Sequence, residues 1–408
     1  MQPSSSFSRS KDPIPGILAN SPETKKEMVN RVMTMMVTMA ITWTGGLRVA
    51  VQGQQVCPDA AEIRPCNCTF DQENYEIDVD CSDASNGQEI HSAFNCPNWF
   101  FKLLREVRVS NSRLDEIVED GFAELAFKVI HMSGTRMIQF HETALNPSKD
   151  RLEVLTLKIG NLDTFPWHAL SGMTKLKHID LSSNSLREVP SDIPTPFLES
   201  LFLTENRIDT IHGNAFRLME NLKYLRLGNN FFQELPTGLV NNLTDLVEFF
   251  AHGGSLECLA EGTLNFNSPY LEQVRLESNR IASIQPGAIS GLEASCTLLD
   301  LSNNNIRHLA EGTFLPIVRN LTKGNGELRL YGNPVECDCT IAWLVLSETL
   351  LRTVTGTCTD GVSFQDLDPE IYLILCTGRR NAWGDIRRWK AALKSGVPIS
   401  HILNHTFN

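Results

Sequence analysis

No stretch of this sequence is apolar for long enough to cross a lipid bilayer. The apolar run at residues 32–43 has 12 residues, whereas a spanning helix needs roughly 20. Basic residues are also in the minority, with 36 lysines and arginines against 48 aspartates and glutamates and a net charge of −12. Such a chain repels nucleic acids and anionic membranes, so we expect neither as a partner and no stable membrane insertion.

The sequence also lacks the motifs on which common enzyme sites are built. The string HGGS at residues 252–255 is similar to an esterase oxyanion loop, but no G-x-S-x-G accompanies it. The string GNGELR at residues 324–329 lacks the third glycine of a dinucleotide loop, and His141-Glu142 has no second histidine four residues after the first. We therefore expect no catalytic residues, no cofactor and no metal site.

What the sequence contains instead is an internal repeat. The stretch LKHIDLSSNSLREVP, residues 176–190, spaces its apolar residues as neither a helix nor a simple strand does, and Asn184 interrupts them. The same frame returns at a step of about 22 to 24 residues over much of the chain. We count ten copies, which begin at Leu104, Phe127, Leu152, Leu176, Leu198, Leu222, Leu246, Leu271, Cys296 and Leu328.

The frame resembles the leucine-rich repeat, L-x-x-L-x-L-x-x-N-x-L. One copy cannot bury its own apolar edge, so copies must stack into a continuous parallel sheet with one elongated core. We predict a leucine-rich repeat solenoid, or horseshoe, with a parallel β-sheet on its concave face and a convex side that is mostly irregular or has short helices. About ten repeats would occupy residues 101–333 between two disulfide caps.

Eight of the eleven cysteines lie in two clusters outside the repeats. The clusters resemble the N-terminal and C-terminal cysteine caps of extracellular leucine-rich repeat proteins, and we place these caps at residues 57–100 and 334–376. The resemblance implies pairing of the first cysteine with the third and of the second with the fourth: Cys57 with Cys68, Cys66 with Cys81, Cys337 with Cys358, and Cys339 with Cys376. Spacing alone leaves the connectivity open. A zinc site is the alternative, but zinc ligands usually come as C-x₂₋₄-C pairs.

The N-terminal segment predicts secretion. The apolar run at residues 32–43 follows basic residues and has the length of a signal-peptide core, so residues 1–53 are expected to form a polar lead plus a signal peptide. Translation starts at Met28 in one interpretation and at Met1 in the other, which makes the segment a short signal anchor. Glycosylation sequons, typical of secreted proteins, stand at Asn67, Asn242, Asn320 and Asn404.

A basic tail follows the second cap. Residues 57–376 carry a net charge of −20, whereas residues 377–408 carry +5. Ile386, Trp389 and Leu393 have helical spacing in this tail. We expect a helix that packs back on the acidic body or frays, with a membrane or partner helix as the alternative.

The repeat register predicts which strand side chains point away from the core. In the central repeats these include aromatic and arginine side chains, which are enriched at recognition surfaces. The predicted partner-binding residues of the concave face are Phe202, Tyr224, Arg226, Phe250, His252 and Arg275, with the aromatic rings of Phe202, Tyr224 and Phe250 stacked on successive strands. The alternative is that large side chains cover one another on a broad sheet without any ligand.

Three cysteines remain outside the caps. Cys296 holds the first apolar position of its repeat, so we expect it to be buried. Cys258 lies two repeats earlier, which is too far for a disulfide between the two. Cys96 is expected to be free or paired with another chain.

The N-terminal cap and the first repeats also carry a narrower resemblance. The string CPDAAEIRPCNCTFDQENYEIDVDCSDASNGQEIHSAF, followed by VRVSNSRLDEI and IHMSGTRMIQF, is similar to the non-catalytic leucine-rich subunits of the decapod shrimp luciferase and its arthropod relatives. This resemblance implies a secreted accessory protein that stabilises another extracellular protein, such as a small catalytic subunit. Two other functions stay open: innate-immune recognition, and a matrix or adhesion role.

Overall fold

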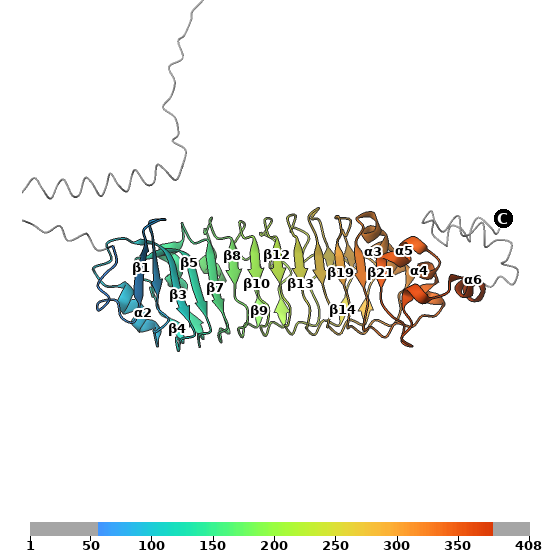
Figure 1. The fold of residues 1–408 in the computed structure, drawn as a ribbon, viewed down its shortest axis with the longest axis horizontal. Helices are drawn as coiled ribbons and strands as arrows, with labels where there is room; N and C mark the ends of the chain where they lie inside the picture. The colour runs from blue at the N-terminus through green and yellow to red at the C-terminus, as the bar shows by residue number, and fades with distance from the viewer. Residues whose placement is uncertain (1–55, 378–408) are drawn as a thin grey trace, which may run out of the picture. The chain divides into compact units, whose positions relative to one another are not determined.

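The computed structural model describes residues 56–377, and these form one stack of strands closed by a cap at each end (Figure 1). The expected signal peptide, the choice between Met1 and Met28, the basic tail and the sequon at Asn404 lie outside the described residues. No helix within residues 56–377 is long and apolar enough to cross a membrane.

One sheet of 13 strands runs through the described residues. Only the pair β1 and β2 is antiparallel, and every other neighbouring pair is parallel. Each of the ten expected repeats contributes one strand, so the predicted solenoid with a parallel sheet is confirmed. In spatial order the strands are β1 (Asn67–Asp71), β2 (Glu76–Asp80), β3 (Leu103–Ser110), β5 (Ala126–Ser133), β7 (Val154–Lys158), β8 (His178–Asp180), β10 (Ser200–Phe202), β12 (Tyr224–Arg226), β13 (Glu248–Phe250), β16 (Gln273–Arg275), β19 (Leu298–Asp300), β20 (Glu327–Arg329) and β21 (Val354–Thr355).

The chain returns between these strands through short elements, as expected. Two-residue strands pair in parallel between neighbouring units: β4 (Glu116–Ile117) with β6 (Gln139–Phe140), β9 (Glu188–Val189) with β11 (Thr210–Ile211), β14 (Cys258–Leu259) with β17 (Ser283–Ile284), and β15 (Leu264–Asn265) with β18 (Ile289–Ser290). Two 3₁₀ helices, η1 (Glu142–Ser148) and η2 (Trp167–Leu170), also lie on the return side. The exception is the 13-residue helix α3 (Glu311–Lys323), which packs against β20 and the C-terminal cap.

A left-handed residue precedes each asparagine position, in all ten repeats. Examples are Glu205 with φ 58° before Asn206 and Gly253 with φ 67° before Gly254. The asparagine then bonds backbone groups of the turn: the Nδ2 of Asn206 donates to the carbonyl oxygens of Leu181 and Leu203, both at 3.0 Å. Such bonds satisfy buried backbone acceptors at the six turns that have an asparagine in this position. The two glycines of HGGS therefore serve this turn, as the repeat frame indicated.

The two caps contain the four expected disulfides. The N-terminal cap, with helix α2 (Gly87–Phe94), has bridges Cys57–Cys68 and Cys66–Cys81, and the C-terminal cap has Cys337–Cys358 and Cys339–Cys376. The second cap is built from η3 (Cys339–Ile341), α4 (Ala342–Val345), α5 (Glu348–Thr353), η4 (Phe364–Asp366) and α6 (Pro369–Thr377). A zinc site on these cysteines is excluded because their sulfur atoms are bonded to one another.

The expectation that Cys296 is buried is wrong. Its side chain is exposed, and its backbone has φ 61°, so the chain turns there. The following residue, Thr297, is buried instead, and its Oγ1 lies within hydrogen-bond distance of the carbonyl oxygens of Leu271 at 2.8 Å and Ala294 at 3.0 Å. A buried hydroxyl with two partners carries little desolvation cost, which explains why a polar residue is tolerated in this position.

Candidate functional site

The strand register divides the outward face of the central sheet into rows. Phe202 pairs with Arg226, Arg226 with Phe250, and Phe250 with Arg275, on β10, β12, β13 and β16. We call these four residues the Phe–Arg row. Asp180 continues the row at one end and Asp300 at the other.

Aromatic rings and guanidinium groups alternate along the Phe–Arg row. The Cζ of Arg226 lies 4.6 Å from the ring centroid of Phe202 and 5.2 Å from that of Phe250, so this cation sits between two rings. The Cζ of Arg275 lies 5.0 Å from the centroid of Phe250 on its other side. Each such contact contributes about 0.5–1 kcal/mol at an exposed site, and together the contacts hold four large side chains in one arrangement.

The prediction that Tyr224 stacks between the two phenylalanines is wrong. Tyr224 stands two residues before Arg226 on the same strand, and its register partners are Ser200 and Glu248. It therefore belongs to the neighbouring row, beside the Phe–Arg row. The sequence placed these side chains on the correct face, but the order of the row required the register between strands.

Arg226 and Arg275 are positioned by different side chains, a carboxylate for Arg226 and an amide for Arg275. The Nη2 of Arg226 donates to Glu248 at 2.8 Å, which forms an ion pair across neighbouring strands. The Nε of Arg275 donates to the neutral side chain of Gln273 at 3.1 Å, and its nearest carboxylate, on Glu277, is 3.9 Å away. The positive charge of Arg275 is thus less closely compensated by a carboxylate than that of Arg226.

Arginines at the ends of the sheet differ from this central pair. Arg329 donates from Nε and Nη2 to the two oxygens of Glu327, at 3.0 and 2.9 Å. Arg108 makes a similar pair with Glu106, at 3.1 and 2.8 Å. In both cases a carboxylate two residues before the arginine accepts two of its hydrogen bonds and compensates its charge, whereas the intra-strand partner of Arg275 is a neutral amide.

Two histidines flank the row. His178 packs edge-on against Phe202 at a centroid distance of 4.9 Å, and burial lowers its pKa, so it is neutral at pH 7. His252 lies 6.1 Å from the ring of Phe250, and its Nδ1 is buried with no hydrogen-bond partner among the described residues. The Nε of Arg226 and the Oε2 of Glu277 are also buried without a hydrogen-bond partner among the described residues. Buried polar atoms without partners are rare in folded proteins, and these three occur together in neighbouring repeats.

The other predicted sites lie away from the row. Asn67 is exposed on the edge strand β1, Asn242 is exposed on a loop, and Asn320 is partly buried on α3. Cys96 and Cys258 are free, as is Cys296.

Glu248 and Gln273 orient Arg226 and Arg275, respectively, and neither residue was predicted from the sequence. The signal that could have revealed them is the set of residues at one repeat position across successive units, here Tyr224, Glu248 and Gln273. Comparison along a single strand hides the relation between Arg226 and Glu248, because the two residues are 22 positions apart in sequence. Gln273, in contrast, lies only two positions before Arg275 on the same strand.

Comparisons with known proteins agree with the fold. Leucine-rich repeat family models match residues 175–195, 196–253 and 269–321. Of the solved structures, a chain of the octameric complex of Latrophilin 3, Unc5D and FLRT2 matches with a TM-score of 0.59 and 23% identity, over 76% of this chain and 98% of that chain. A chain of the glycosylated Toll–Spätzle complex of Drosophila matches with a TM-score of 0.52 and 16% identity, over 72% of this chain and 48% of that chain.

Two sequence relatives differ greatly in how much of the chain they cover. Chondroadherin of Mus musculus is 47% identical over 53 residues, which are 13% of this chain and 15% of the relative. The Oplophorus-luciferin 2-monooxygenase non-catalytic subunit of Oplophorus gracilirostris is 26% identical over 328 residues, 78% of this chain and 88% of the relative. The chain has the leucine-rich repeat fold, and over 78% of its length it is similar to the non-catalytic subunit of this luciferase.

Proposed function

We propose that this chain is a secreted, non-catalytic binding protein that acts as an accessory or stabilising subunit for another extracellular protein. The long relative is itself named a non-catalytic subunit, which supports the absence of enzyme activity here. The four disulfides fit an oxidising compartment, where such bonds form and persist.

The observation that carries the proposal is the Phe–Arg row. Aromatic and arginine side chains dominate binding energy at protein interfaces, because they bury large areas and lose little conformational freedom when they are already ordered. Arg226 and Arg275 are ordered by ring contacts, and their side chains remain 38% and 41% exposed. The row therefore offers a preorganised surface to a protein partner, flanked by Tyr224 and His252.

The remaining charge on Arg275 favours a carboxylate on that partner. An incoming Asp or Glu side chain would meet a guanidinium whose hydrogen-bond partner, Gln273, is neutral and whose ion pair with Glu277 is long, at 3.9 Å. A bidentate arginine–carboxylate pair is both strong and geometrically specific. We therefore assign the partner an acidic side chain inserted between aromatic contacts.

The test is quantitative capture from native extracellular fluid by the immobilised chain. Phe202→Ala combined with Phe250→Ala should reduce the recovered partner at least about tenfold, since truncating an aromatic anchor commonly costs 2 kcal/mol or more. The matched control is Phe231→Ala, an equally simple truncation of an exposed phenylalanine outside the strand rows. Denaturation of each variant checks that the fold is retained.

The outcome separates the candidate functions. A single small polypeptide lost in the double variant and kept in the control supports the accessory role. Recovery of collagen-like chains or proteoglycans would support the matrix role instead of the accessory role. Retention of microbial material would support the immune role. Unchanged capture by the double variant would move the site away from the row.

A further inference from the structure

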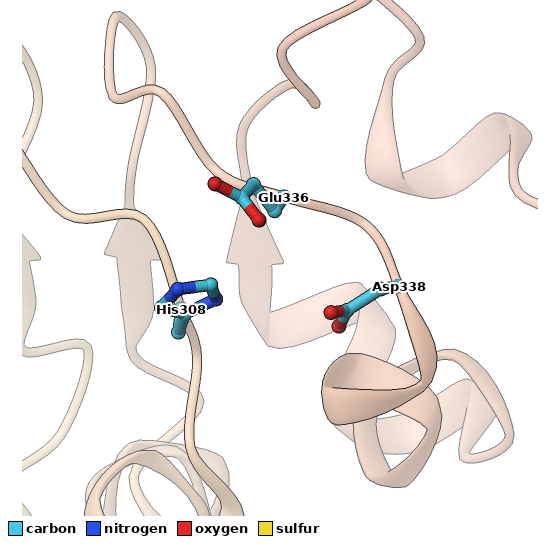
Figure 2. A group of neighbouring side chains, drawn as sticks. All are labelled: His308, Glu336 and Asp338. Carbon is cyan, nitrogen blue, oxygen red and sulfur yellow. The ribbon is translucent and has the colours of Figure 1, made fainter.

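A second group of side chains converges at the start of the C-terminal cap, far from the Phe–Arg row in sequence. His308 comes from the segment before α3, and Glu336 and Asp338 come from the segment that enters the cap (Figure 2). One ligand atom of each residue lies within 4.8 Å of the other two. In Figure 2 the carboxylate of Asp338 points toward His308, and Glu336 lies above the space between them.

The backbone that presents these side chains is firmly held. The N–H of Glu336 donates to the carbonyl oxygen of Arg307 at 2.8 Å, which joins the two segments directly beside His308. Asp338 stands between Cys337 and Cys339, and each of these cysteines is in a disulfide. The three side chains therefore start from fixed positions, as a preorganised site requires.

Asp338 is also oriented by its own hydrogen bonds. Its Oδ1 accepts from the backbone N–H of Thr340 at 2.8 Å and from the Oγ1 of Thr340 at 2.5 Å. Both bonds use the same oxygen, which leaves Oδ2 for another partner. Hydrogen bonds of this kind to a ligating carboxylate are the usual support around a metal site.

Existing charges do not balance the group. Within residues 56–377 the two carboxylates form a single ion pair, between Arg307 Nη1 and Glu336 Oε1, at a long 3.7 Å. Two carboxylates and an imidazole thus share one distant cation. The space between them attracts a further positive charge.

We propose that His308, Glu336 and Asp338 bind a divalent cation of the zinc type. The nitrogen donor decides the class of metal, because calcium and magnesium prefer shells made of oxygen atoms, whereas zinc accepts imidazole nitrogen together with carboxylate oxygen. Three protein ligands leave at least one position for water. Donors about 2.1 Å from a tetrahedral ion lie roughly 3.4 Å apart, so the side chains must draw together slightly. The side chain of His308 is exposed, so a change of its rotamer can bring the imidazole closer to the two carboxylates.

Such an ion would tie the last turn of the solenoid to its cap. His308 belongs to the repeat side and the two carboxylates to the cap side, so binding adds a link across the junction that Arg307 and Glu336 already join through their backbone. The ion would then stabilise the folded chain by an amount that grows with the logarithm of the ratio of its concentration to the dissociation constant.

The experiment is a zinc titration of the full secreted chain, against a chromophoric chelator at neutral pH. All proteins carry His401→Gln and His405→Gln, because this sequence pair in the tail is a competing zinc ligand. Asp338→Asn keeps the oxygen that accepts from Thr340, and Glu336→Gln keeps the side-chain shape, so both should fold. His308→Ala, Asp338→Asn and Glu336→Gln should each weaken binding at least about tenfold, since even the supporting residues around a metal are worth 10- to 100-fold.

His212→Ala is the matched control. The Nε2 of His212 lies 3.9 Å from Glu188, an exposed histidine beside a single carboxylate, and its loss should leave zinc affinity unchanged. The proposal is overturned if no saturable zinc binding occurs, if Asp338→Asn binds as tightly as the parent, or if His212→Ala weakens binding equally. Calcium binding that survives His308→Ala would also overturn it, because that site would consist of oxygen atoms alone.

Discussion

Asn304 offers the most direct test of what holds the repeats together. Its side chain is 4% exposed, its Nδ2 donates to the carbonyl oxygens of Leu276 and Leu301, both at 3.0 Å, and its Oδ1 accepts from the backbone N–H of Ile281 at 2.9 Å. Asn304→Ala leaves these three buried backbone groups without that partner. At about 1 kcal/mol for each net bond, the variant should lose about 3 kcal/mol of unfolding free energy.

The adjacent residue provides the control. Asn305 is exposed and makes one hydrogen bond, from Nδ2 to the carbonyl oxygen of Arg280 at 3.3 Å, so Asn305→Ala should cost less than about 1 kcal/mol. Asn304→Asp is a second probe of nearly equal volume. It should cost at least as much as Asn304→Ala at pH 7, because a carboxylate would face two carbonyl oxygens.

Urea denaturation of the oxidised chain at 25 °C, followed by far-UV circular dichroism, measures all three variants. Equal slopes of free energy against urea are needed for the comparison, since a changed slope signals a different unfolded state or a partial transition. Similar losses for Asn304→Ala and Asn305→Ala would refute the reasoning, because the buried amide would then contribute no more than an exposed one.

Three further predictions concern the caps, pH and a free thiol. Replacing Cys339 and Cys376 with serine should cost about 4 kcal/mol by loop entropy for their separation of 37 residues, measured by denaturation, and an unchanged midpoint would contradict it. Burial lowers the pKa of His178 and of His131, so these residues bind protons more readily in the unfolded chain. The free energy of unfolding should therefore fall as pH drops below about 6.5, and the variant with both His131→Gln and His178→Gln should lose most of that pH dependence. Exposed Cys296 should react with iodoacetamide in the folded protein, and protection until unfolding would contradict its placement.

Much of the fold could be predicted from the sequence because each repeat must bury the same apolar positions and turn the chain at the same place. A leucine at Leu201 or Leu225 must be buried, and an asparagine at Asn206 or Asn230 must turn the chain, so one copy predicts the next. The helix α3 was not foreseen, because the long insertion before β20 breaks the repeat step. Thr297 was overlooked for another reason: the backbone at Cys296 is left-handed, the Cys296 side chain is exposed and Thr297 is buried, which apolar spacing does not show.

The repeat pattern was sufficient to predict which side chains of the central strands lie outside the core, and cysteine clustering was sufficient to predict which cysteines form the caps. Alternation along a strand is a local property, set by the two-residue period of extended backbone. The tertiary structure alone decided which outward side chains meet. Arg226 lies between Phe202 and Phe250, and His308 faces Glu336 and Asp338, because stacking brings residues from different repeats into register. Contacts of this kind depend on the register between units and on the rotamers of long side chains, and neither is encoded within a single repeat.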